Sequence, residues 1–232
     1  MEPLRQLARK RLEGKKVIAV MSTKGGVGKS LIASLIALSF PSSAIIDLDL
    51  HGMAVPKLFG VEGKLHEVSK EGIEPFRVGS VDVFSLAGVV GDRYVVLPGR
   101  NQANVMEELI AYSNVKPQTV IFDMPPGLGD EVLVLEEVSD FVPVVVTTPS
   151  RVSSKVVNYV LSYLKEKGKR PYVVVNMAYI NCDGKVIRPW GVAKGDLELP
   201  LDPTVEDYIG RIHEYKGEVR QRVEEFVRSK LM

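Results

Sequence analysis

A glycine-rich stretch near the amino end constrains the fold of this chain more than any other feature. Residues 21–30 read MSTKGGVGKS, after the apolar run 17–20 and before the helix-like run 31–38. A buried strand therefore enters a glycine-rich loop that opens a helix. Glycines let consecutive backbone N–H groups turn toward one spot, and the helix points its positive dipole end there. The sequence predicts a phosphate-binding loop.

The side chains of this loop suit a magnesium nucleotide. Lys29 would reach the β- and γ-phosphates, and the Ser30 hydroxyl would be a ligand of Mg²⁺. Thr23 departs from the strict pattern, which has glycine there. The alternative is a glycine turn without a ligand, but Gly-Lys-Ser between a strand and a helix favours the nucleotide site. The residues expected to contact the nucleotide here are Gly25, Gly26, Val27, Gly28, Lys29, Ser30 and Leu31.

Length and charge set the broad class. The 232 residues suit a single α/β domain over 1–232, with a short helix within 1–16 and a helical tail over 204–232. Thirty Lys and Arg against 29 Asp and Glu leave a charge of +1, so no global basic field favours nucleic acid or a membrane. The single cysteine fits a reducing compartment, and no signal-peptide pattern opens the chain. We therefore expect a cytoplasmic protein.

Two amphipathic segments allow a second interpretation. Residues 4–13 are rich in basic side chains and could be a nucleic-acid arm, although a helix packed on the edge of the domain is favoured. The tail from residue 204 carries an apolar stripe with balanced charges, which favours a helix packed on the sheet over a membrane anchor. Gly217 could divide that tail in two.

Apolar runs alternate with helix-like segments along the rest of the chain. This order predicts a doubly wound, mostly parallel sheet flanked by helices, with right-handed crossovers. Residues 51–80 are rich in Gly, Pro and charge, and are expected to be a loop that could act as a mobile switch. The strands are expected at 44–46, 81–86, 119–122, 142–147 and 172–175, and the helices at 101–113, 131–138 and 152–167.

Carboxylates follow two of the predicted strands. The strand at 44–46 ends in Asp47 and Asp49, and the strand at 119–122 ends in Asp123 before a Met-Pro-Pro-Gly turn. The carboxyl ends of parallel strands beside a phosphate loop are where open α/β sheets bind ligands. A carboxylate at the end of an apolar strand there typically holds Mg²⁺ or its waters.

Asn176 ends the predicted strand 172–175, where such folds commonly read the base. A guanine site of the familiar type continues with Lys and, three residues after the Asn, Asp; here Met177, Ala178 and Tyr179 follow. ATP is therefore the favoured nucleotide. Asn176 could equally be a cap at the strand end.

Lys24 makes the loop more distinctive. The run of residues 24–30, KGGVGKS, resembles the deviant Walker A motif of the MinD/ParA/Mrp group of P-loop ATPases. In that group the first lysine crosses a dimer interface to the partner's nucleotide. A cation delivered in this way would neutralise charge that develops on the transferred phosphoryl group. The alternative is a solvated loop lysine.

The resemblance extends in order from about residue 16 to residue 209, and is to the Mrp/ApbC, or Nbp-type, family of nucleotide-binding proteins. The blocks that carry it are IDLD at 46–49 with Gly52 and Pro56, DMPPG at 123–127 with Gly129-Asp130, TTP at 147–149, NMAY at 176–179 and LPLDP at 199–203.

This resemblance implies a cytosolic ATPase homodimer, with nucleotide at the interface, that binds or transfers iron–sulfur clusters to client proteins. Lys24, Lys29 and Asp49 would be catalytic, with Asp49 orienting the water that attacks the γ-phosphate. The residues that would hold Mg²⁺ are Ser30, Asp47 and Asp123. The residues that would hold adenine are Asn176, Pro200, Leu201 and Asp202.

The cluster site departs from the family pattern. Relatives that carry a cluster usually place Cys-x-x-Cys shortly after the Asn-Met block, whereas this chain has Cys182 alone. Two copies of Cys182 in a dimer supply two thiolates, and a 4Fe–4S cluster ordinarily takes four. Cys182 is therefore either a cluster ligand helped by other groups or a leftover thiol. The second hypothesis is a MinD/ParA-like adaptor switched by nucleotide without a cluster, and the third is a member that binds nucleotide without turnover.

Overall fold

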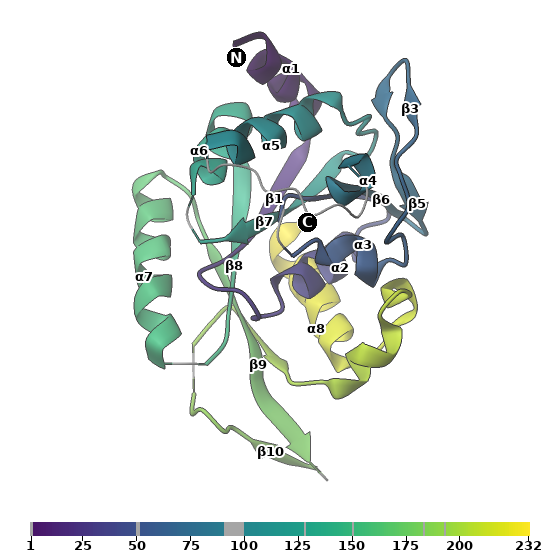
Figure 1. The fold of residues 1–232 in the computed structure, drawn as a ribbon. Coiled ribbons are helices and arrows are strands. Elements are labelled where there is room, and N and C mark those ends of the chain that lie inside the picture. Colours follow the sequence, from purple (N-terminus) through teal and green to yellow (C-terminus); the bar gives the residue numbers. More distant parts are fainter. Residues whose placement is uncertain are drawn as a thin grey trace.

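A computed structural model gives the arrangement of the chain (Figure 1). One mostly parallel sheet occupies its centre, with helices on both faces. The described residues are 2–49, 52–90, 100–127, 129–149, 151–182, 184–192 and 194–232.

Strand β1 (Lys16–Ser22) lies in the middle of the sheet and is buried on both faces. Ile18 and Val20 point into one core, whereas Val17, Ala19 and Met21 point into the other. A strand covered on both sides needs a continuous apolar run rather than an alternating one. Residues 17–20 meet that requirement. The glycine-rich loop therefore follows the carboxyl end of a central strand.

The sheet order is β10-β9-β8-β1-β7-β2-β6-β5, with β11 also paired to β9. Pairs between β9, β8, β1, β7, β2 and β6 are parallel, and β5 and β10 pair antiparallel at the edges. The predicted fold class is confirmed. Besides β1, the strands are β2 (Ser43–Asp47), β3 (Val68–Ser69), β4 (Gly72–Ile73), β5 (Phe76–Val78), β6 (Val81–Ser85), β7 (Thr119–Pro126), β8 (Phe141–Thr147), β9 (Tyr172–Cys182), β10 (Lys185–Ile187) and β11 (Leu197–Pro200).

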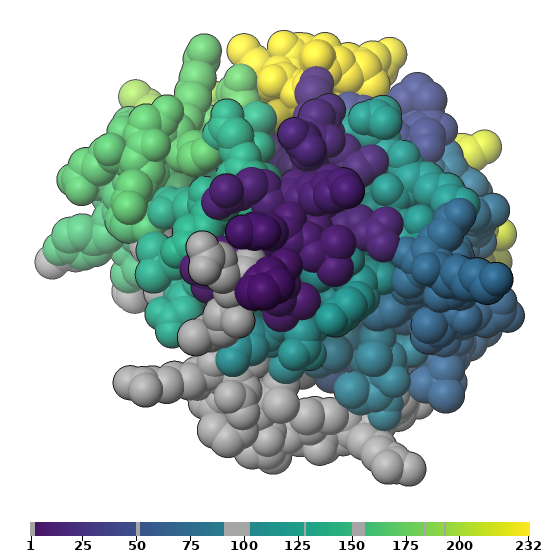
Figure 2. Space-filling view, turned by 90° about the horizontal axis from the view of Figure 1, so that it is seen from above, coloured from purple at the N-terminus to yellow at the C-terminus, as the bar shows by residue number. Residues whose placement is uncertain are grey.

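Helices cover the two faces separately. Helices α2 and α8 pack on the core that Ile18 and Val20 enter, and α1, α5, α6 and α7 cover the other face. In the view of Figure 2 the amino-terminal segment lies between the 100–140 region and the carboxyl-terminal segment. The helices are α1 (Glu2–Leu12), α2 (Lys29–Leu38), α3 (Ala54–Leu58), α4 (Ala87–Val90), α5 (Arg100–Tyr112), α6 (Asp130–Val138), α7 (Arg151–Glu166) and α8 (Glu218–Phe226).

Two expectations need correction. Residues 52–80 are not all loop. Helix α3 forms on the segment after β2, and two short antiparallel pairs follow, β3 with β4 and β5 with β6. The tail is not helical from residue 204 onward. Its first part forms 3₁₀ turns at Pro203–Tyr208 and Ile212–Glu214, since Asp202 caps the first turn and Gly210 takes a left-handed φ of 87° that ends it. Gly217 does precede the regular helix α8, as its sequence position suggested.

Candidate functional site

The loop between β1 and α2 has the backbone shape that its glycines permit. Gly26 and Gly28 have φ values of 76° and 84°, in the left-handed region that other residues rarely adopt. Gly28 is also the N-cap residue of α2, and its carbonyl accepts the first helical hydrogen bond, from Ile32 N at 3.0 Å. The N–H groups that open α2 therefore face the space above the loop, which is the usual arrangement for binding phosphate.

Three contacts anchor this loop to the sheet. Ser22 Oγ donates to the Lys24 carbonyl at 3.0 Å, and the amide Nδ2 of Asn176 donates to the Val27 carbonyl at 2.9 Å. The backbone N–H of Gly127 donates to the Ser22 carbonyl at 2.7 Å, so β7 holds the end of β1. The loop is thus held by the end of β7 on one side and by a side chain of β9 on the other.

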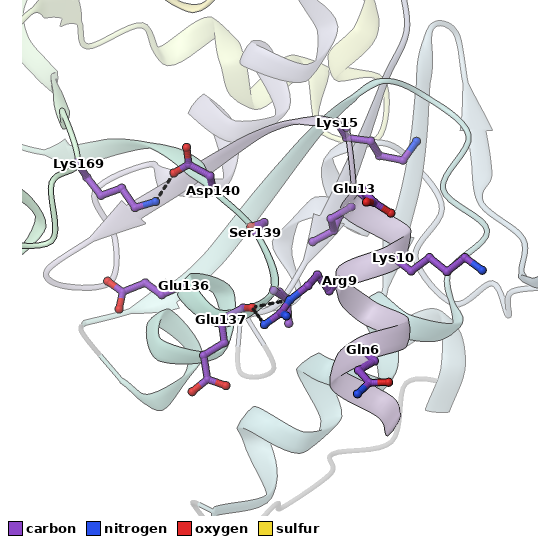
Figure 3. A pocket seen from close by; sticks show the side chains of 13 residues that line it. Gln6, Arg9, Lys10, Glu13, Lys15, Glu136, Glu137, Ser139, Asp140 and Lys169 are labelled. Atoms are coloured by element: carbon purple, nitrogen blue, oxygen red, sulfur yellow. Dashed lines mark hydrogen bonds and ion pairs between the residues drawn. The ribbon is translucent and has the colours of Figure 1, made fainter. Parts of the chain in front are cut away.

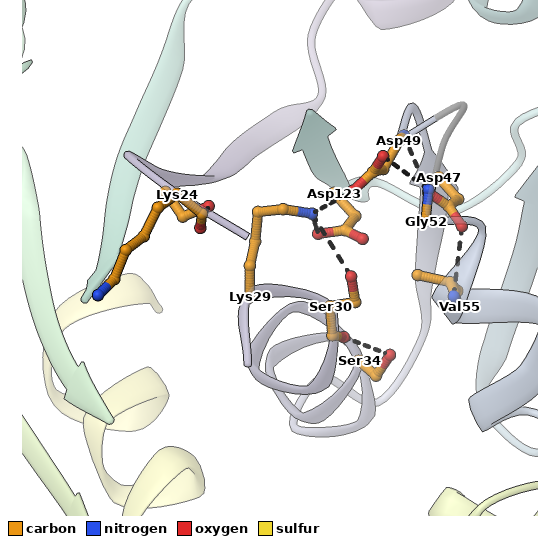
Figure 4. A network of polar contacts seen from close by, with 10 residues as sticks. Lys24, Lys29, Ser30, Ser34, Asp47, Asp49, Gly52, Val55 and Asp123 are labelled. Carbon is orange, nitrogen blue, oxygen red and sulfur yellow. Dashed lines mark hydrogen bonds and ion pairs between the residues drawn. The ribbon is translucent and has the colours of Figure 1, made fainter. Parts of the chain in front are cut away.

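The predicted lysine and carboxylates meet at the base of the loop (Figure 4). Lys29 Nζ lies 2.6 Å from Asp123 Oδ1 and 3.7 Å from Asp49 Oδ2. Asp47 and Asp123 are directly opposite each other on the neighbouring strands β2 and β7. Because parallel strands end at the same sheet edge, the sequence pattern alone predicts that these carboxylates lie together.

Asp47 and Asp123 are buried, and burial changes their acidity. Burial, aided by the nearby Asp123, raises the pKa of Asp47 well above its usual value. Burial also raises the pKa of Asp123, although the ammonium of Lys29 opposes that rise. Asp47 accepts hydrogen bonds from the backbone N–H groups of Asp49 at 3.0 Å and Val55 at 3.3 Å. It therefore fixes the segment between β2 and α3.

The oxygen atoms here fit Mg²⁺ better than a soft metal. Asp123 Oδ2 is buried and has no hydrogen-bond partner among the described residues. Ser30 Oγ lies 3.4 Å from Lys29 Nζ, at the same end of the loop. Within the described ranges no three His, Cys, Asp or Glu side chains form a metal site. Mg²⁺ suits this setting because it usually takes one or two protein oxygens and completes its shell with phosphates and water.

A cavity of about 430 Å³ lies over the loop. Lys24 is exposed at its rim, and its side chain points away from Lys29 (Figure 4). Sequence reasoning missed the far wall, where Lys57 and Leu58 come from α3 and Ile209 from the end of the first 3₁₀ turn. The lining residues are Ser22, Lys24, Gly25, Gly26, Gly28, Lys29, Ser30, Leu31, Asp49, Gly52, Ala54, Lys57, Leu58, Pro126 and Ile209.

The four residues expected to hold adenine do not line this cavity. Asn176 is only 3% exposed and lies beneath the phosphate loop. Pro200 is buried in β11 and Leu201 is half-buried next to it. Asp202 accepts hydrogen bonds from Thr204 N at 3.0 Å and from the Tyr215 hydroxyl at 2.5 Å. Their role toward the base stays a prediction.

A larger cavity of about 710 Å³ lies near the amino ends of β1 and β8, between α1 and the turn from α6 to β8 (Figure 3). Its charged side chains are evenly balanced. Lys169 pairs with Asp140, and Arg9 donates to the Glu137 carbonyl at 2.7 Å. We assign the site to the smaller cavity, because the glycine-rich loop, the start of α2 and the buried Lys29 lie there.

Cys182 lies at the end of β9, where the β9–β10 hairpin extends away from the body of the molecule (Figure 1). Its thiol is exposed and unbridged. Trp190 follows β10 and is 55% exposed. The only cysteine of the chain therefore sits on an accessible strand that begins in the core beside the phosphate loop.

The site has a glycine-rich loop between a central parallel strand and a helix. A buried lysine and a buried aspartate lie at the base of this loop. These features define the class of P-loop NTPases. The sequence matches the NUBPL iron-transfer P-loop NTPase family, of the ParA group, over residues 13–196. Because this match covers most of the chain, the protein belongs to that family.

Relatives of known name agree with this assignment. The iron-sulfur cluster carrier protein of Saccharolobus solfataricus is 34% identical over 220 residues, covering 82% of this chain and 72% of that protein. The cytosolic Fe-S cluster assembly factor CFD1 of Saccharomyces cerevisiae is 32% identical over 66% of this chain, and the chain spans 57% of its length. The chain spans only 39% of the chloroplastic factor HCF101 of Arabidopsis thaliana, at 30% identity.

Solved structures show the same fold. A nucleotide-binding protein from Archaeoglobus fulgidus, solved in complex with ADP, superposes with a TM-score of 0.79 at 27% identity, covering 92% of this chain and 94% of that one. The septum site-determining protein MinD of Pyrococcus horikoshii superposes with a TM-score of 0.68 at 18% identity, covering 94% and 97%. Among the described residues of this protein, no helix is both long and apolar enough to cross a membrane.

Proposed function

We propose that this protein binds ATP over the glycine-rich loop and hydrolyses it slowly. The observation that carries the proposal is the buried Lys29–Asp123 pair, 2.6 Å apart, at the base of a loop whose helix N–H groups face a cavity of about 430 Å³. Adenine as the base is supported by the ADP complex of the Archaeoglobus fulgidus protein, whose fold matches. The Asn-Met-Ala-Tyr run at 176–179, which lacks the guanine pattern, supports the same choice.

The chain's own residues account for the chemistry by position and charge. The loop backbone and the N-terminus of α2 bind the phosphates, and Lys29 moves its charge from Asp123 toward the β- and γ-oxygens. Asp49 orients the water that attacks the γ-phosphate. The hydrogen bond from Gly52 N to Asp49 Oδ1, at 2.9 Å, fixes the direction of that carboxylate.

Mg²⁺ would be held by Ser30 and Asp123, with Asp47 supporting the site from behind. When bound it neutralises charge on the phosphate oxygens. Lys24 is placed to act on a second subunit, because its ammonium is exposed and none of the described residues pairs with it. The proposed active form is therefore a homodimer with nucleotide at the interface.

We further propose that the protein carries an iron–sulfur cluster to a client protein in the cytosol. The carrier and assembly factors among its relatives support this cargo, and the yeast relative is named as cytosolic. Cys182 is the cysteine available to hold the cluster, at the exposed end of β9. A dimer supplies two such thiolates, so other ligands must complete a 4Fe–4S cluster.

Isothermal titration with Mg-ADP tests the nucleotide site. We expect Lys29→Ala to lose measurable binding, because the phosphates lose the cation that reaches them. Lys165→Ala is the matched control, since Lys165 is an exposed lysine near the end of α7, away from the cavity. Equal affinity in wild type and Lys29→Ala would contradict the proposed site.

Anaerobic reconstitution with iron and sulfide tests the cargo. We expect wild-type protein to gain visible absorption and bound iron, and Cys182→Ala to lose both. If neither protein holds iron, the carrier role fails and a nucleotide-switched adaptor of the MinD/ParA kind becomes the better description. The titration above is independent of this result, so the two parts of the proposal can fail separately.

A further inference from the structure

Asn176 makes a contact that the nucleotide-binding proposal leaves unexplained. Its side-chain Nδ2 donates to the Val27 carbonyl in the glycine-rich loop at 2.9 Å, across 149 residues of chain. We propose that Asn176 is a positioning residue that fixes the shape of the phosphate loop. This inference rests on the proposed nucleotide site and concerns how that site is held in shape.

The local geometry makes this bond specific. Asn176 lies in β9, which is separated from β1 by β8, so its amide reaches the loop from two strands away. The register of β9 against β11 shifts near this point, and Met177 has a left-handed φ of 54°. Such an irregularity changes the direction in which the nearby side chains point. The strained backbone here is consistent with a side chain that must point at one target.

Gly28 is shaped around the same amide. A Cβ added at Gly28 would overlap Asn176 Nδ2, so the amide would have to move. Glycine at this position therefore serves two needs, a φ of 84° and room for the amide. The Val27 carbonyl that the amide holds lies between the two left-handed glycines, so the bond restrains the turn that aims the loop's N–H groups.

Burial makes the bond matter. Asn176 is 3% exposed and Val27 is 2% exposed, so water cannot readily replace the amide. A buried carbonyl that loses its donor pays a desolvation penalty and tends to turn toward another partner. The phosphate loop would then lose its pre-set shape, and affinity for the phosphate part of any ligand would fall.

This role differs from base recognition in a measurable way. A residue that reads adenine changes the preference for ADP over GDP and leaves binding of a base-free polyphosphate unaltered. A residue that shapes the loop weakens both nucleotides and the polyphosphate by the same factor. The ratio of ADP to GDP affinity then stays at its wild-type value.

Isothermal titration of the full chain with Mg-ADP, Mg-GDP and Mg-tripolyphosphate separates the two roles. The variants are Asn176→Ala and the isosteric Asn176→Asp, which places an oxygen against the Val27 carbonyl. Asn181→Ala is the matched control, because Asn181 lies on the same strand and its amide donates to Glu218 Oε2 instead, at 2.7 Å. Thermal unfolding without ligand checks that each variant is folded, and the aspartate variant serves if the alanine variant is not.

We expect both Asn176 variants to bind ADP and tripolyphosphate about tenfold more weakly, with an unchanged ratio of ADP to GDP affinity. Asn181→Ala should bind as wild type. Unchanged affinity in the Asn176 variants, or a changed ADP to GDP ratio with tripolyphosphate binding intact, would overturn the inference alone. If wild-type protein binds none of the three ligands, the proposed nucleotide site fails and this inference falls with it.

Discussion

The three glycines of the phosphate loop differ in what a methyl group would meet. A Cβ at Gly25 would meet no atom within 4 Å, and Gly25 has no left-handed φ. A Cβ at Gly26 would also be free, but the φ of 76° strains any other residue. At Gly28 a φ of 84° is combined with the close approach of Asn176 Nδ2. Identical substitutions should therefore have graded effects.

We predict that Gly28→Ala destabilises the ligand-free protein most, that Gly26→Ala costs about 1 kcal/mol from backbone strain, and that Gly25→Ala changes stability little. Urea unfolding of the three variants beside wild type measures the order. Gly25→Ala is the control for adding a methyl group to the loop. An equal loss of stability at Gly25 and Gly28 would show that the left-handed turn and the Asn176 contact do not constrain the loop.

The sequence was a good guide to single residues where a motif ties them to a strand end. Lys29, Asp49 and Asp123 were predicted to share a site, and the structure brings all three together. It was a poor guide to what packs underneath. The contact between Asn176 and Val27 depends on how β9 sits two strands from β1, and sequence spacing carries no such information.

At the level of elements, buried strands were easier to predict than edges and tails. β1 and β7 carry apolar runs between turn signals. The structure starts β7 at the expected Thr119 but continues it through Asp123 to Pro126, beyond its expected end. β10 and β11 are three and four residues long, and they form by pairing with β9 rather than by a pattern of their own. The 3₁₀ turns after Asp202 have an apolar stripe like that of an α-helix. Periodicity alone therefore could not distinguish 3₁₀ turns from an α-helix.

A hydrogen bond joins the buried Tyr215 of this tail to Asp202, the residue that caps its first 3₁₀ turn. Tyr215 is 1% exposed, and its hydroxyl donates to Asp202 Oδ2 at 2.5 Å. Burial pushes the pKa of Asp202 upward, but hydrogen bonds from Thr204 and Tyr215 outweigh it and hold that pKa below its usual value. Because the folded pKa is lowered, the stabilisation is present above the ordinary value of 3.8 and is lost as the pH falls below it.

Tyr215→Phe should therefore destabilise the protein by about 1 kcal/mol at neutral pH, a modest value because the carboxylate is partly exposed. The difference from wild type should shrink as the solution is acidified and Asp202 is protonated. Urea unfolding at a series of pH values measures this. Tyr159→Phe is the control, since Tyr159 is an exposed tyrosine of α7. A pH-independent difference would mean that the pair adds no charge-assisted bond.

At the scale of the whole molecule, a single chain assembles most of the proposed nucleotide site, and the side chain of Lys24 lies at its rim. Lys29 reaches two carboxylates from within the loop, whereas Lys24 extends away from them. An exposed lysine at the rim of the cavity, with its side chain turned away from these carboxylates, is accessible to a neighbouring subunit. If the proposed dimer delivers Lys24 to the nucleotide of the partner subunit, two inactive variants should complement each other.

We predict that Lys24→Ala binds Mg-ATP with near wild-type affinity but loses turnover, because its partner lacks the lysine that completes the site. Lys29→Ala should bind no nucleotide, yet it still carries an intact Lys24. In a mixture, a heterodimer holds ATP in the Lys24→Ala subunit and receives Lys24 from the Lys29→Ala subunit, so phosphate release should reappear although each variant alone is inactive. The Lys24→Ala, Lys29→Ala double variant in place of Lys29→Ala is the control and should restore nothing. Full turnover by Lys24→Ala alone, or no recovery in a mixture shown to contain heterodimer, would refute delivery of Lys24 between subunits.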